Sequence, residues 1–512
     1  MKITASGALP PIIVLLASLS VHARDITLTE ALLSTLQNQP EVRVAQATVR
    51  EDKGVLRQAQ GAFDWTPELN TVVRTDREPG VTGNNSLDFD KTRTVQTSIG
   101  ATKRFRTGIS VSPEISLIRT DENKFYDPVT QSGISFSMVI PLLKGAGKVS
   151  ASADERAARK NLRATGEAQV HRINRLLFET VSAYWQVRGS WRLLQVAESG
   201  LARAKQAENI VGALTVGGQF APGSHQRTLA ELNLQEIAVD RRRQLTQSAG
   251  QTLIDAIGIS EEHQALRTVT PLPDPTAPRF DPVLSDGDLV NLALARRRDL
   301  AAARHSLDAH EILVARFRHD TKPRLDLSLG LDYQGIRANT HAPLGSLQTL
   351  RRDLSGPDYT VGLTLELPLG KNVAKGRLQE QRAKAQMAEL EIRRLESAIR
   401  TGVRDVAGRI GSIRQRYRMA EKTVELYESV YQDTREQVIR GEANINQLVD
   451  IGDKLTEALL RRTQAATDFA VALAELRFVT GTGTALAHDA EPDSGSVEFA
   501  LNDFMNLPEP DF

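Results

Sequence analysis

The sequence predicts a mainly α-helical protein with a smaller β portion, arranged as two internal structural repeats. Apolar residues recur at helical spacing over unusually long stretches, from about Ser150 to Leu214 and from about Lys371 to Ile439. Shorter segments instead alternate apolar and polar residues, which is typical of strands that bury one face. The order helix, β-region, long helix, glycine-containing break, helix occurs twice along the chain, which indicates a duplication.

The first residues have the features of an export signal. Lys2 precedes an apolar run from Ile12 to Leu19, and Val21 and Ala23 stand at the two positions that a signal peptidase reads. A signal peptide is therefore predicted over residues 1–23. Beyond it, no stretch approaches the roughly 18 apolar residues that a membrane-spanning helix needs. If the exported chain crosses a membrane, it is expected to do so as β-strands.

Composition excludes several kinds of chemistry. The 512 residues contain no cysteine, so disulfides, Cys-ligated metals and a Cys nucleophile are excluded. The 64 Lys and Arg residues nearly balance the 63 Asp and Glu residues. A chain without excess positive charge is a poor candidate for a nucleic-acid partner.

The first repeat is expected to span residues 24–260. Its elements in order are a helix from Thr29 to Ala62, β-hairpins over about 68–140, a long helix from Ser150 to Leu214, a tip at about 215–224, and a helix from His225 to Ile257. Four alternating segments are expected in the β-region, with a tight turn at Phe105–Gly108. A Pro-rich linker over 261–285 follows and separates the repeats.

The second repeat, over residues 286–480, follows the same plan. Its elements are a helix from Asp286 to His319, a β-hairpin over about 323–368, a long helix from Lys371 to Ile439, a tip at about 439–444, and a helix from Asn444 to Thr480. Within the first helices, Pro40-Glu41-Val42 matches Arg298-Asp299-Leu300. A C-terminal tail over 481–512 is rich in Pro, Asp and Glu, which is typical of loosely packed segments.

The strands of the second repeat are strongly two-sided. Alternate positions from Leu325 to Tyr333 are apolar, and polar or small residues such as Asp326 and Ser328 stand between them. The same alternation continues from Val361 to Leu367. Such strands suit a transmembrane β-barrel, and they also suit an ordinary half-exposed sheet, so the pattern alone leaves both open.

No catalytic, cofactor-binding or metal-binding constellation is found in the sequence. Gly145-Ala146-Gly147-Lys148 lacks the first glycine of a phosphate-binding loop, because position 142 is Leu. His310-Glu311 lacks the second histidine of a zinc-protease motif. The chain is therefore expected not to be an enzyme and to need no cofactor.

Several ordered motifs resemble the TolC-like outer-membrane efflux family, also called outer-membrane factors. They are the opening Leu28–Leu32, the run Asn38–Val42, the strand-to-helix exits Ile140–Gly145 and Leu367–Gly370, and the segment Arg440–Asp450. The last of these is similar to the periplasmic hairpin that joins a long and a short helix in that family. The resemblance extends over nearly the whole mature chain.

The resemblance implies a homotrimer whose β-barrel lies in the outer membrane of a Gram-negative-type cell and continues into an α-helical barrel in the periplasm. The implied function is a passive exit duct of a tripartite efflux or type I secretion system. Its partners would be outer-membrane lipid, a periplasmic adaptor (membrane fusion) protein and an inner-membrane transporter. The alternative is a soluble periplasmic coiled-coil scaffold or adaptor. About six strands per chain, rather than the family's usual four, would be a departure.

The resemblance also assigns two sets of site residues. The adaptor-docking tips would be Val216, Gly217, Gly218, Arg440, Gly441 and Glu442. The periplasmic gate would be Gln447, Asp450 and Asp453, where relatives carry two acidic residues one turn apart. Gln447 replaces the first of those acids, which would weaken a ring of like carboxylates.

Overall fold

The computed structural model describes residues 24–81, 87–122, 128–216, 222–259, 266–278, 285–338, 354–440 and 442–482. These residues form two compact units, which are described separately. The helical unit takes in the described parts of Met1–Arg43, Arg172–Arg296 and Ile399–Phe512, and the sheet unit is Val44–His171 with Arg297–Ala398. The predicted signal peptide, residues 261–265 and 279–284 of the expected linker, and nearly all of the C-terminal tail lie outside the described residues.

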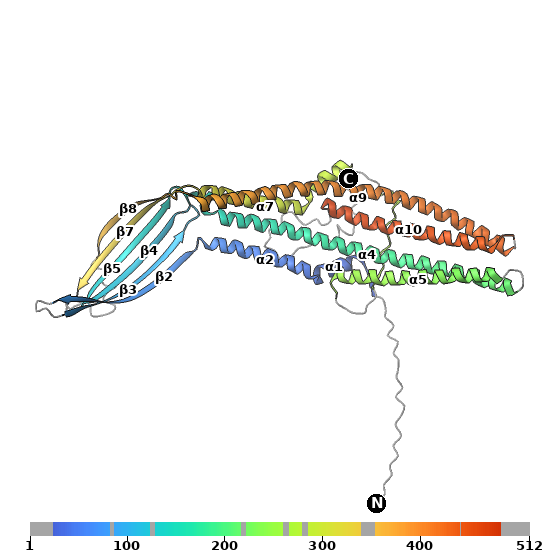
Figure 1. Cartoon of the computed structure of the whole chain (residues 1–512), viewed down its shortest axis with the longest axis horizontal. Coiled ribbons are helices and arrows are strands. Elements are labelled where there is room, and N and C mark those ends of the chain that lie inside the picture. The colour runs from blue at the N-terminus through green and yellow to red at the C-terminus, as the bar shows by residue number, and fades with distance from the viewer. Residues whose placement is uncertain are drawn as a thin grey trace, which may run out of the picture. The chain divides into compact units, whose positions relative to one another are not determined.

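The sheet unit contains a six-stranded antiparallel sheet in the order β2-β3-β4-β5-β7-β8 (Figure 1). Its strands are β2 (Trp65–Val81), β3 (Leu87–Arg104), β4 (Ser110–Glu122), β5 (Val129–Pro141), β7 (Arg324–Ala338) and β8 (Leu354–Glu366). Four strands come from the first repeat and two from the second, as the alternation of the sequence predicts. The expected tight turn joins β3 to β4, where the Gly108 N–H donates to the Phe105 carbonyl over 2.8 Å.

The register of the sheet separates an apolar face from a polar one. Leu325 pairs with Leu365 and Leu327 with Leu363, so these side chains share one face. On β8 this face is open, since Leu363 is 66% and Leu365 64% exposed. Asp326, which pairs with Thr364, lies on the other face. The predicted alternation is therefore present in three dimensions, and large apolar side chains remain uncovered in the isolated chain.

The helices of the sheet unit are α3 (Gly147–Ala151), α7 (Arg298–Asp320), and parts of α2 (Pro40–Gly61), α4 (Ala153–Val216) and α9 (Asn372–Ile439). Polar side-chain contacts join α7 to α4 and to α9. Lys160 of α4 pairs with Asp308 of α7 at 2.7 Å, and the His310 Nδ1 of α7 lies 2.8 Å from the Gln381 Nε2 of α9. Burial lowers the pKa of His310, which favours its neutral form.

Two helices predicted as continuous are each broken about a third of the way along, so this prediction was wrong. The expected helix Thr29–Ala62 is α1 (Leu28–Asn38) followed by α2, and Asp286–His319 is α6 (Asp286–Arg296) followed by α7. Gln39 and Arg297 are extended, with ψ of 118° at both positions. Pro40 explains the first break, because a residue before proline disfavours helical dihedrals. The second break has no proline.

An ion pair holds the second break in place. The guanidinium of Arg297 donates to both carboxylate oxygens of Asp299, at 2.8 and 2.6 Å, and both side chains are largely buried. Burial alone would favour the neutral acid, but the bonds from Arg297 and the Leu300 N–H, with the charges of Arg297 and His171, lower the pKa of Asp299.

The expected long helix from Ser150 also differs at its start, where α3 precedes α4 and Ser152 separates them.

The helical unit combines α1, α5 (Pro222–Ile257), α6, α10 (Ile445–Thr480) and parts of α4 and α9. A cluster of buried side chains in this unit includes Leu32, Tyr184, Leu253 and Ile257. A short parallel pair, β1 (Arg24–Ile26) with β6 (Leu266–Thr268), lies against this core. The buried Tyr184 hydroxyl donates to the Ile26 carbonyl over 3.1 Å, which satisfies its polar atom.

Helices α4 and α10 approach each other closely at two glycines. A Cβ at Gly200 would lie 2.9 Å from the Thr456 Cγ2, and a Cβ at Gly189 would overlap the side chain of Thr467. No helix in the described part of the chain is long and apolar enough to span a membrane.

Candidate functional site

The two helix breaks of the helical unit carry the expected docking residues. Helix α4 ends at Val216 and α5 begins at Pro222, while α9 ends at Ile439 and α10 begins at Ile445 (Figure 1). Gly217, Gly218 and Gly441 lie outside the described residues. The breaks are neighbours, because Val211 near the end of α4 packs with Ile445 and Leu448 of α10.

Local hydrogen bonds organise the second break. The Asn444 side chain caps α10 by accepting from the Asn446 N–H over 2.9 Å. The Glu442 N–H donates to the Gln437 carbonyl over 2.8 Å. Arg440 pairs with Glu442 at 3.0 Å and with Glu436 at 3.6 Å, and all three side chains are mostly exposed. Two of the expected docking residues, Arg440 and Glu442, are therefore paired with each other at the surface.

The three expected gate residues have different surroundings on α10. Gln447 is exposed, and its N–H donates to the Asn444 carbonyl over 2.9 Å in the first turn. Asp450 is exposed and forms an ion pair with Lys454 at 2.7 Å. Asp453 instead turns toward α5, where its Oδ1 accepts a bond from the Gln235 Nε2 over 3.1 Å.

Asp453 lies in a cluster of charged side chains from three helices. Gln235 also donates to Glu231 over 3.2 Å, which brings a second carboxylate near Asp453. The guanidinium of Arg203 on α4 donates to the Thr456 hydroxyl over 2.6 Å, and its positive charge acts to lower the pKa of Asp453. Burial, followed by the charges of Glu231 and Asp450, raises the pKa of Asp453 from 3.8 to about 6. This is the strongly perturbed carboxyl of the candidate site.

The sequence did not indicate Arg203, Glu231 or Gln235. These residues lie on α4 and α5 at ordinary helix positions, and Gln235 is 218 residues away from Asp453. Nothing in their spacing could have singled them out.

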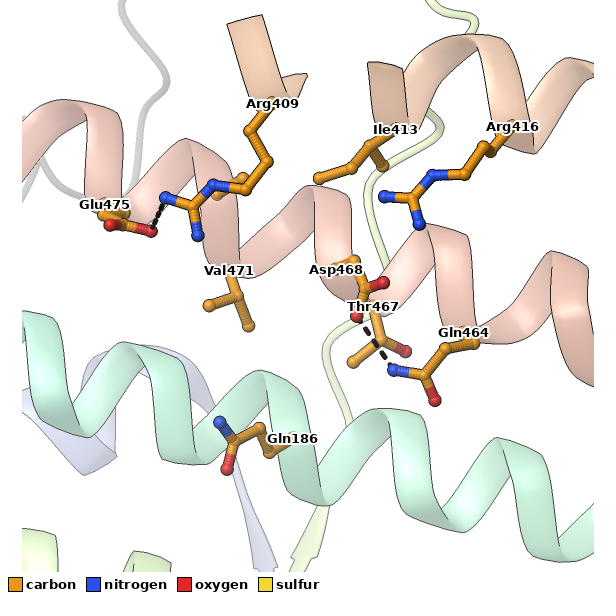
Figure 2. A pocket seen from close by; sticks show the side chains of 10 residues that line it. Gln186, Arg409, Ile413, Arg416, Gln464, Thr467, Asp468, Val471 and Glu475 are labelled. Carbon is orange, nitrogen blue, oxygen red and sulfur yellow. Dashed lines mark hydrogen bonds and ion pairs between the residues drawn. The ribbon is translucent and has the colours of Figure 1, made fainter. Parts of the chain in front are cut away.

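A cavity of about 420 Å³ lies between α4, α9 and α10 (Figure 2). Arg409 and Glu475 form an ion pair across its edge at 2.6 Å, and the Gln464 amide donates to Asp468 over 2.8 Å. Its other polar residues include Gln186 and Arg416. Two arginines and two carboxylates line this cavity, so its charges balance.

Within the described residues, no group of His, Asp and Glu side chains has a metal-binding arrangement.

A sequence model for the outer membrane efflux protein family matches residues 289–482. The resemblance to the TolC-like outer-membrane efflux family is confirmed. The matched region includes the second repeat's hairpin, its long helix, the break after it, and α10 with all three expected gate residues. No curated protein sequence matches this chain.

Solved structures show the same fold. The outer-membrane channel OprN matches with a TM-score of 0.64 at 16% identity, over 89% of both chains. CusC, described with transmembrane channel formation, matches with a TM-score of 0.63 at 15% identity, over 90% of this chain and 93% of its own. The outer membrane protein VceC from Vibrio cholerae matches with a TM-score of 0.62 at 15% identity, over 89% and 96%. The fold class of helices with a smaller sheet is therefore confirmed.

Proposed function

We propose that this chain is a passive outer-membrane exit duct that works as a homotrimer. The family match supports an outer-membrane efflux duct. One structural observation carries the proposal further, namely a sheet with an uncovered apolar face, an opposite polar face and two open edges. In the described part of the chain, β2 and β8 each pair on one side only. Three copies that join β2 to β8 would satisfy both edges and place lipid against the apolar face.

The proposed organisation follows the two repeats, with a signal peptide over 1–23, repeats over 24–260 and 286–480, and a tail over 481–512. Each repeat would contribute hairpins to the membrane part and a helix pair to the periplasmic part. In this arrangement the helix breaks at about 215–224 and 439–444 would lie at the periplasmic end of the duct.

The proposed partners are a periplasmic adaptor and an inner-membrane transporter, in either a tripartite efflux or a type I secretion system. Val216, Gly217, Gly218, Arg440, Gly441 and Glu442 would contact the adaptor. A bulky residue at Gly441 should abolish export while the protein remains in the membrane. Normal cross-linking of that variant to the adaptor would contradict the docking assignment.

The proposed gate would use Gln447, Asp450 and Asp453 near the closed end of the duct. In each copy of the chain, Lys454 forms an ion pair with Asp450. A ring of three paired Asp450 carboxylates would attract cations less strongly than a ring of unpaired ones. Asp450→Ala should raise single-channel conductance, and unchanged conductance and cation block would remove Asp450 from the gate. Asp450→Asn is the matched control for size.

Native mass measurement of the protein extracted in mild detergent from isolated outer membranes tests the duct. A particle of three chains in that fraction is the expected result. A monomer or dimer recovered from the soluble periplasm would instead support a coiled-coil scaffold or adaptor and would overturn the proposal.

A further inference from the structure

A second cavity, of about 890 Å³, lies in the sheet unit where the strand ends meet α7 and the start of α9. Its volume is within the range of pockets that hold ligand-sized molecules. Six basic residues line it, against three acidic ones. The basic residues are Arg104, Lys144, Arg316, Arg324, Lys371 and Arg377.

Strand register places this cavity on the polar face of the sheet. Arg104 pairs with Ser110 and Ser110 with Val139, so these three lining residues share one face. Arg324 and its cross-strand partner Glu366 also line the cavity. Arg324 lies two positions before Asp326 on β7, so both side chains are on the polar face. The leucines of the opposite face do not line it. In the proposed duct, the cavity therefore opens toward the conduit rather than toward lipid.

The three acidic residues of the cavity each lie within ion-pair distance of Arg316 or Arg324. Arg324 pairs with Asp326 at 2.6 Å and lies 3.8 Å from Glu366. Arg316 pairs with Asp154 and lies 3.7 Å from Asp320.

Four cations remain, Arg104, Lys144, Lys371 and Arg377, and none of them forms an ion pair with a described carboxylate. The charge of Arg377 acts on Glu380 from beyond ion-pair distance, and the lining has three more basic than acidic residues, so the cavity wall is net positive.

The backbone at Lys371 is a second indication of function at this place. Lys371 has a φ of 52° and is the one non-glycine residue with positive φ in the described part of the chain. A lysine in this region costs free energy that glycine or asparagine would largely avoid, and such residues are concentrated at functional sites. The first turn of α9, Asn372–Ala374, also lines the cavity, and amide groups at a helix start favour negative charge.

We propose that this cavity binds multivalent anionic solutes, such as phosphate- or carboxylate-bearing molecules, as they pass through the duct. The inference rests on the proposed function for the passage of cargo, while binding of the anion itself does not depend on it. Charges distributed over β3, the loop after β5, and α9 suit a ligand with several anionic groups. A single monovalent ion would reach few of them.

Binding is tested by calorimetric titration of sodium pyrophosphate into the full-length protein purified in detergent at low ionic strength. The variant K144Q/K371N/R377Q removes three unpaired cations, and asparagine tolerates the dihedrals of position 371. The control R382Q/R393Q/R400Q removes three charges from α9 outside the cavity.

We expect the cavity variant to bind pyrophosphate at least about tenfold more weakly and the control to stay within about twofold. Equal affinity in the wild type and the cavity variant, or no binding by the wild type, overturns the inference.

Two further measurements separate the possible sources of failure. In planar bilayers under a KCl gradient, the cavity variant should lower the chloride-to-potassium permeability ratio about two- to threefold and the control should not. A protein that binds pyrophosphate but forms no channel would refute the duct and leave the anion site standing. Loss of wild-type binding in phosphatidylglycerol nanodiscs, with binding retained in phosphatidylcholine nanodiscs, would assign the site to lipid headgroups and overturn the cargo assignment.

Discussion

Neutralising Asp453 should stabilise the protein at neutral pH and leave its stability unchanged in acid. The Asp453 carboxyl is half-buried between α5 and α10 and faces Glu231 and Asp450, so its charged form is disfavoured in the folded chain. Asp453→Asn removes that charge. Its side-chain oxygen can still accept the hydrogen bond from Gln235, so the packing of α5 against α10 is retained.

The sign follows from the raised pKa. The folded state keeps the proton up to about pH 6, whereas the unfolded chain releases it near 3.8, so rising pH favours unfolding between these values. If the whole rise in the pKa of Asp453 acted on stability, it would lower the free energy of unfolding by about 3 kcal/mol at neutral pH. Because Asp453 is only half-buried, solvent screening reduces the expected effect to about 1 to 2 kcal/mol.

Thermal unfolding of the detergent-solubilised protein, followed by far-UV circular dichroism from about pH 4 to pH 8, measures the effect. D453N and wild type should coincide at the acid end, and D453N should melt higher above about pH 6. Glu457→Gln, one turn further along α10 and exposed, is the control and should show no such divergence. Parallel profiles for wild type and D453N across the whole range would refute the burial argument.

Two further predictions concern the close approach of α4 and α10 and the buried Arg297–Asp299 ion pair. Gly189→Ala should lower the free energy of unfolding by about 1 to 3 kcal/mol, because the new Cβ would overlap the Thr467 side chain. Adding Thr467→Ala should restore most of this loss. An unchanged melting temperature in G189A would contradict the close approach of α4 and α10. Asp299→Asn should lower the free energy of unfolding by about 2 to 4 kcal/mol at neutral pH, because it leaves the buried Arg297 without its charged partner. In the wild type, the stabilisation by this ion pair is lost as pH falls through the lowered pKa of Asp299. Glu41→Gln, at the matching position of the first repeat, should cost at most about 1 kcal/mol, because its pair with Arg172 is exposed; equal losses in the two variants would be inconsistent with this reasoning.

Local patterns along the chain predicted most of the elements. The alternation from Leu325 to Tyr333 and from Val361 to Leu367 predicted the strands, because a period of two is a property of the strand itself. Helical spacing predicted a helix end at Ile439, where α9 ends, and a helix from Asn444, which is the N-cap residue before α10. The breaks at Gln39 and Arg297 were missed, since apolar periodicity continues across both and the second is held by the Arg297–Asp299 pair.

The candidate site divides in the same way. The sequence placed Gln447, Asp450 and Asp453 on one helix, and the resemblance to the efflux family implied a common role for them. Only the packing of α5 against α10 decided that Asp453 meets Gln235 and Glu231 while Asp450 pairs with its own neighbour Lys454. The basic cavity likewise joins residues from Arg104 to Arg377 that are far apart in the chain. Apolar periodicity reflects local backbone geometry, which the sequence determines directly. The pKa and the partners of an ionisable side chain depend on the residues that folding places next to it.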